Sequence, residues 1–142
     1  MNPSNTPAVT EKPARPSPQG NALSAPYWEA AAQGRLLLQQ CADCGKVRHY
    51  PRLLCDGCFS ERTQWTPASG RGTVHSWTTC HHAFHPGFAA ELPYVLVTVD
   101  LAEGVRALGR WRGAGLAIGD PVQAHFEQRA EGPELYFTPE IP

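Results

Sequence analysis

The second half of the chain alternates between apolar and polar residues with the period of two that is typical of half-buried strands. In 94–101, Val97 and Val99 fall on one face, and Leu96 and Thr98 fall on the other. The same alternation predicts strands at 73–80, 105–112, 122–129 and 135–137. In the first of these, Val74 and Ser76 are expected on one face, with His75 and Trp77 on the other.

Residues with turn chemistry separate the predicted strands. Glu103-Gly104 predicts a tight hairpin turn, while Gly119-Asp120-Pro121 and Gly132-Pro133 break the chain farther on. Five short strands with such connections within 66–142 predict a small closed barrel of the OB type. A split sandwich is the alternative.

A short helix is predicted in the first quarter of the chain. Ser24 can cap its N-terminus, Pro26 is tolerated in the first turn, and Gly34 ends it. The apolar run 35–40 then leads into the first cysteine, so 22–40 is interpreted as a helix and a lead-in strand. Residues 1–21 hold prolines among small polar residues, and we expect a flexible, disordered tail there.

Four cysteines have the spacing of a metal site. Cys41-x2-Cys44 is followed, after ten residues, by Cys55-x2-Cys58. Two such knuckles bring four thiolates to one tetrahedral ion, which favours zinc over an iron–sulfur centre. Pairs of core thiols are the alternative, but this short polar stretch has no core for them to join. Because a closed four-sulfur site leaves no position for substrate, the zinc in 41–65 is expected to be structural.

Composition narrows the class of protein. The chain has 142 residues and a formal net charge of −1, so no basic excess points to nucleic acid or to a membrane surface. Neither a secretion signal nor an apolar run of membrane-spanning length is present, and we therefore expect a cytoplasmic protein. In a reducing compartment, its five cysteines are better candidates for metal ligands than for disulfides.

Two further clusters are candidate ligand contacts. The stretch from Cys80 to His85 could be a second metal site or a polar loop, and Phe84 and Phe88 could supply apolar surface to a pocket there. The second cluster shares one strand face with Leu108 and could hold phosphate groups or form solvated ion pairs. It consists of Arg106, Arg110 and Arg112.

The sequence shows no set of catalytic residues. It has no nucleophile elbow, phosphate loop or paired-acid motif, and Cys80 is the only thiol outside the knuckles. A chain of this kind is better interpreted as a binding or accessory protein than as an enzyme acting alone.

Several short sequence motifs occur in and around the knuckles in a fixed order. They are Tyr27-Trp28, Gly34-Arg35-Leu36, Gln39-Gln40-Cys41-Ala42-Asp43-Cys44-Gly45, Pro51-Arg52, Gly70-x-Gly72-Thr73-Val74 and Pro93-Tyr94. In this combination the chain resembles the acyl-CoA-associated zinc-ribbon/OB-fold family, formerly a domain of unknown function. The resemblance implies a mainly β protein with a short N-terminal helix, a rubredoxin-like zinc ribbon and a five-stranded OB-fold barrel.

The resemblance also implies a role. It suggests a non-catalytic accessory subunit that binds CoA or acyl-CoA and docks on a thiolase-like enzyme in a hetero-oligomer. A single-stranded nucleic-acid-binding module is an alternative, but 66–142 carries five arginines against eight acids, a net charge of −3. A purely structural adaptor is a third interpretation.

Overall fold

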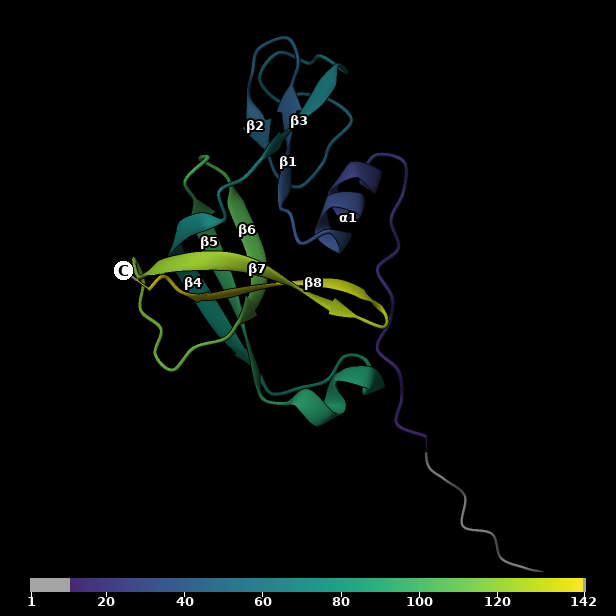
Figure 1. The fold of residues 1–142 in the computed structure, drawn as a ribbon, viewed down its shortest axis with the longest axis vertical. Coiled ribbons are helices and arrows are strands. Elements are labelled where there is room, and N and C mark those ends of the chain that lie inside the picture. Colours follow the sequence, from purple (N-terminus) through teal and green to yellow (C-terminus); the bar gives the residue numbers. More distant parts are fainter. Residues whose placement is uncertain (1–10, 142) are drawn as a thin grey trace, which may run out of the picture.

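The structure, a computed structural model, describes residues 11–141. In Figure 1 a small sheet lies at one end, a barrel lies at the other, and the helix Ala25–Ala32 lies beside both. In chain order the elements are α1 (Ala25–Ala32), β1 (Leu37–Cys41), β2 (Val47–Arg48), β3 (Thr63–Pro67), β4 (Arg71–Cys80), the 3-10 helix η1 (Pro86–Glu91), β5 (Tyr94–Leu101), β6 (Arg106–Trp111), β7 (Pro121–Arg129) and β8 (Gly132–Pro139).

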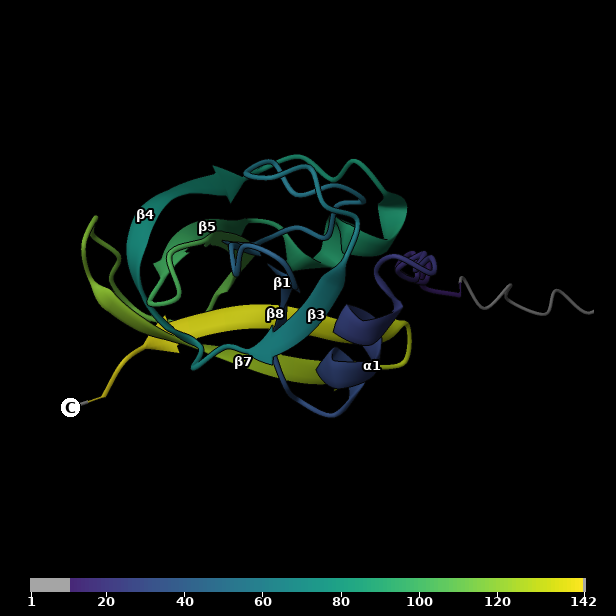
Figure 2. The same ribbon diagram turned by 90° about the horizontal axis from the view of Figure 1, so that it is seen from above.

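The predicted barrel is confirmed. Its strands follow the order β4-β5-β6-β8-β7 and close through a pairing of β7 with β4. All neighbours are antiparallel except β6 and β8, which run parallel. The view from above in Figure 2 shows the strands curving around one interior. In the smaller sheet, β1 lies between β2 and β3.

The barrel interior is filled by the inner-face residues that the alternation predicts. Val97, Val99 and Phe137 are completely buried, and Ala107 is nearly so. Gly109 faces the same interior, where a Cβ atom would lie 2.9 Å from the Phe137 ring. A glycine at this position therefore lets the aromatic ring fill the middle of the barrel.

The face assignment in β4 is wrong beyond Val74. The register with β5 shifts between Val74 and Ser76, as in a β-bulge. As a result His75 and Ser76 both lie on the outer face, where they hydrogen-bond to Asp100 and Thr98. A bulge adds one residue to a strand, so strict alternation cannot be carried across it.

Helix α1 packs its buried residues Tyr27, Ala30 and Ala31 toward the barrel. Its bounds match the prediction, and Gly34 follows it with a φ of 75°. Ser24 stands at the N-cap, but its side chain makes no capping bond. The hydroxyl instead accepts a hydrogen bond from the Asn21 amide at 3.1 Å. Among the described residues, no helix is long and apolar enough to cross a membrane.

Residues 11–24, here called the N-terminal strap, have no regular structure but contact the barrel end. A Cβ atom on Gly87 would lie 2.4 Å from the Ala14 carbonyl oxygen, and one on Gly132 would lie 3.1 Å from Pro18 Cδ. The side chain of Arg15 is only 10% exposed. The expected tail spans 1–21; residues 1–10 lie outside the described residues, and the packing of Arg15 departs from the picture of a free tail.

Candidate metal centre and ligand cavity

The four predicted metal ligands come together at the end of the small sheet. Their sulfur atoms all lie within 4.8 Å of one another. The Cys41–Cys58 and Cys44–Cys55 sulfur pairs are each 3.6 Å apart. Zn–S bonds of about 2.3 Å in a tetrahedron place sulfurs about 3.8 Å apart, so the site fits zinc closely. The four cysteines form the donor set of a structural zinc site.

Backbone amides lower the pKa of some of these thiols and so favour the thiolate form that binds a cation. The Cys44 amide lies 3.5 Å from Cys41 Sγ and lowers the pKa of Cys41 to about 6. The pKa of Cys55 is lowered too, by the amides of Cys58 and Gly57. For Cys58 the amide of Ser60 acts in the same direction, but hydrogen bonding with Cys41 and desolvation raise its pKa to about 12. Four crowded thiolates need a divalent cation between them.

The two knuckles differ at the residue after the second ligand. In the first, Gly45 has a φ of 77°, the left-handed conformation that glycine adopts without steric cost. In the second, Phe59 adopts a φ of 60° and leaves its ring 76% exposed. Leu53 and Leu54 of the same loop are also exposed. This end of the ribbon therefore presents apolar side chains to its surroundings.

The histidine-rich stretch after β4 is no second metal site. Among the described residues, the four knuckle cysteines are the only group of three or more potential ligands close enough to hold an ion. His85 Nδ1 instead accepts a hydrogen bond from the Gly87 amide and caps η1. Phe84 is 90% exposed, whereas Phe88 is half buried against Tyr94.

The three arginines expected on one strand face are each paired with a carboxylate. Arg106 Nε donates to Asp100 at 2.7 Å, and Arg106 is the first residue of β6, four positions before Arg110. Arg112 pairs with Glu127 and lies 4.0 Å over the Tyr136 ring. Arg110 is 13% exposed, lies 3.8 Å over the Tyr94 ring and pairs with Glu91 and Glu134. Their positive charges are largely neutralised within the chain.

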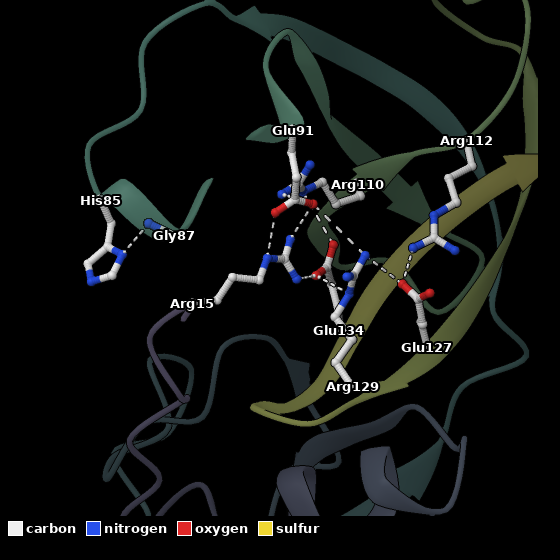
Figure 3. A network of polar contacts seen from close by, with 9 residues as sticks. All are labelled: Arg15, His85, Gly87, Glu91, Arg110, Arg112, Glu127, Arg129 and Glu134. Atoms are coloured by element: carbon white, nitrogen blue, oxygen red, sulfur yellow. Dashed lines mark hydrogen bonds and ion pairs between the residues drawn. The ribbon is translucent and has the colours of Figure 1, made fainter. Parts of the chain in front are cut away.

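Arg110 belongs to a larger network at the end of the barrel, which Figure 3 shows from close by. Arg15 reaches Glu91 through two hydrogen bonds of 2.7 and 2.9 Å, and it also contacts Glu134. Arg129 contacts Glu134 at 3.0 Å and Glu127 at 2.8 Å. We call this set the arginine–glutamate network: Arg15, Arg110, Arg112 and Arg129 with Glu91, Glu127 and Glu134.

A cavity of about 590 Å³ lies beside this network. One wall is the outer face of β5 and β6, and the opposite walls come from the strap, α1 and the ribbon residues Tyr50 and Pro51. Its apolar lining is mainly Leu23, Tyr27, Trp28, Tyr50, Phe88, Tyr94, Leu96, Leu108 and Leu135. The Tyr50 hydroxyl accepts a hydrogen bond from the Leu108 amide at 3.1 Å, which ties the ribbon to the barrel across this space.

The cavity contains only two of the five residues expected to contact a ligand. Phe88 and Arg110 line it, whereas Phe84, Arg106 and Arg112 do not. Arg15, Tyr50 and Leu108 also line the cavity and were not predicted as ligand contacts. The outward apolar position of Leu108, on a strand face with three arginines, was a signal that could have indicated a covered surface.

Comparison with known proteins matches both parts of the chain to family models. Residues 28–64 match the ChsH2 rubredoxin-like zinc ribbon domain, and residues 65–127 match the ChsH2 C-terminal OB-fold domain. A probable enoyl-CoA hydratase alpha subunit from Thermomonospora curvata is 37% identical over 99% of this chain and 45% of its own length. The benzoylsuccinyl-CoA thiolase subunit BbsA from Geobacter metallireducens is 31% identical over 52% of this chain and 48% of its own length.

The chain thus spans about half the length of these curated relatives. Among solved structures, the Ltp2-ChsH2(DUF35) aldolase contains a chain that is 37% identical, with a TM-score of 0.79. That alignment covers 87% of this chain and 99% of the other. By their names, these relatives are a CoA-ester hydratase subunit, a CoA-ester thiolase subunit and a chain of an aldolase. With its four-cysteine ribbon and five-stranded barrel, the chain belongs to the ChsH2-type (DUF35) family of zinc-ribbon/OB-fold proteins associated with acyl-CoA enzymes.

Proposed function

We propose that this chain is a non-catalytic accessory subunit that binds an acyl-CoA substrate and docks on a thiolase-like or related acyl-CoA enzyme. The hetero-oligomer would complete or stabilise the active site of the partner. The names of the relatives support this role, since they describe a subunit of an enoyl-CoA hydratase, a subunit of a benzoylsuccinyl-CoA thiolase and an aldolase, which are three different reactions. A shared non-catalytic part explains how one fold serves several chemistries.

The observation that carries the proposal is the cavity. It lies on the β5–β6 face, which corresponds to the second and third strands of the barrel, where OB folds commonly bind ligands. Its described lining contains no histidine, cysteine or aspartate. Of its other polar groups, Glu134 is paired with arginines and the Ser24 hydroxyl hydrogen-bonds with Asn21. A ligand held there would be positioned by this chain and transformed by residues of the partner.

The test is co-expression with a candidate acyl-CoA hydratase, thiolase or aldolase subunit from the same organism. We expect one complex on gel filtration, and we expect the purified partner to lose most of its activity when this chain is omitted. The zinc-free Cys41→Ser chain serves as a matched control that should neither join the complex nor restore activity. A partner that is fully active alone and forms no complex would contradict the proposal.

A further inference from the structure

The outer face of a small barrel usually carries polar residues where it meets water, but part of this barrel does not. Leu96 and Leu108 project outward from β5 and β6, and Leu108 is 45% exposed even with the strap and ribbon in place. Tyr94 and Phe88 extend the apolar surface toward η1. A volume of about 590 Å³ lies within the range of small-molecule sites. The face is concave and partly covered rather than flat.

We propose that this cavity binds the apolar acyl group of the thioester, and that the CoA phosphates remain outside it. This inference rests on the proposed function and assigns its ligand site. The acyl chain would lie along Leu96 and Leu108, between the barrel and Trp28 of α1, with the strap as the side wall. Burial of each methylene group there supplies the affinity.

The arginine–glutamate network explains why the phosphates stay outside. Arg110 and Arg129 each contact Glu134, and Arg15 contacts both Glu91 and Glu134. A phosphate that approached these guanidinium groups would meet the carboxylates that already hold them. Glu131 adds a further negative charge to the lining. The network therefore closes one end of the cavity as a wall and does not act as a phosphate clamp.

The strap makes the site preformed. Arg15 lies 4.7 Å over the Phe88 ring and bonds to η1 and β8, while Pro18 lies against Gly132. At the other end, Gly20 contacts Trp28, where a Cβ atom would lie 3.0 Å from the indole. Because both ends of the strap are fixed, the wall is in place before a ligand arrives, which reduces the entropy lost on binding.

The proposal is tested by the dependence of affinity on acyl length, measured by calorimetry with the zinc-loaded full chain and two probes, butyryl-CoA and octanoyl-CoA. One buried methylene changes affinity by about fourfold, so octanoyl-CoA should bind at least about tenfold more tightly even if only part of the chain is buried. Leu96→Trp and Leu108→Trp each fill the cavity and should reduce this ratio to about twofold or less. Ile118→Trp, on a 73% exposed side chain, should leave it unchanged.

Equal affinities for the two probes in the wild-type chain would overturn the proposal. So would an octanoyl preference that both cavity-filling variants retain, because the thioester would then bind this chain at another place. A retained octanoyl preference would contradict this ligand site but not the accessory role. Failure to form a complex with the partner would contradict the accessory role but would not change the ratio of the two affinities. Failure of the site and failure of the function are thus distinguishable. Circular dichroism and zinc content of each variant verify that it is folded.

Discussion

The ribbon and the barrel are folded by different physical means within one chain. In the barrel, Val97, Val99 and Phe137 are completely buried and form an apolar core. In the ribbon beyond Leu38, the buried residues are Gln39, Cys41, Arg48 and Cys55. Two of these are metal ligands and two are polar. The difference teaches that a metal ion replaces the hydrophobic core where the sequence is too short to build one.

The largest effect is expected from removal of the metal. Cys41→Ser should lose zinc and unfold the ribbon, because structural zinc contributes about 10–16 kcal/mol to the folding of small zinc peptides. The measurement is zinc content by mass spectrometry together with circular dichroism. Cys80→Ser is the control. Cys80 lies outside the sulfur cluster, so this variant should keep its zinc. Stoichiometric zinc in the Cys41 variant would refute the assignment.

The barrel should lose stability, but not zinc, when a core side chain is removed. Phe137→Ala leaves a cavity in its middle and should lower the free energy of unfolding by about 3–5 kcal/mol while the zinc stays bound. Phe84→Ala changes the same residue type at a position that is 90% exposed, and it should cost less than about 0.5 kcal/mol. Urea denaturation measures both. Similar losses in the two variants would mean that the barrel core does not lie where we place it.

His49, a titratable residue in the ribbon, provides a test of how the ribbon packs against the rest of the chain. Burial lowers the pKa of His49 to about 4, next to the rings of Tyr27 and Tyr50. Between pH 6.5 and pH 4 the unfolded chain binds this proton and the folded chain does not, so stability rises with pH in that window. Acidification from pH 7 to pH 4 should cost about 3 kcal/mol through His49. The free energy of unfolding is measured against pH for the wild type and for His49→Gln, and the difference between the two curves isolates this contribution. The same pH dependence in both proteins would contradict the prediction.

The smallest effect concerns the strap. Arg15→Gln removes a guanidinium that is 10% exposed and bonded to two carboxylates, and it should lower stability by about 1–2 kcal/mol. Arg62→Gln breaks an ion pair whose arginine is 75% exposed and should cost less than about 0.5 kcal/mol. Thermal denaturation compares the two. If Arg15→Gln melts like the wild type, the strap is not held in solution as the structure shows.

Much of the barrel could be predicted because its signal is local. The bounds of β5, 94–101, follow from alternation alone, and the four-cysteine spacing indicates the metal centre. The short strands β2 and β3 were not predicted, since β2 has two residues and β3 shows no alternating burial. The bulge at His75 was missed because one inserted residue breaks the period on which the prediction depended.

The cavity could not be predicted because its walls come from distant segments. Arg15 lies in a proline-rich stretch that has little to bury, and its partners Glu91 and Glu134 are 76 and 119 positions away. Nothing local distinguishes it from a solvated arginine. For Arg110, the strand face was predicted correctly, but the carboxylates that neutralise its charge stand on η1 and β8.

The same separations set an order for folding. Loop closure over 119 positions is entropically unfavourable until the intervening chain is already compact. Because Glu134 lies in the last barrel hairpin, we expect the strap to dock on it after that hairpin has formed. An element that docks last also detaches first, at a free energy well below that of global unfolding. Detachment of the strap would then open the cavity and let it exchange its contents, while the barrel itself stays closed.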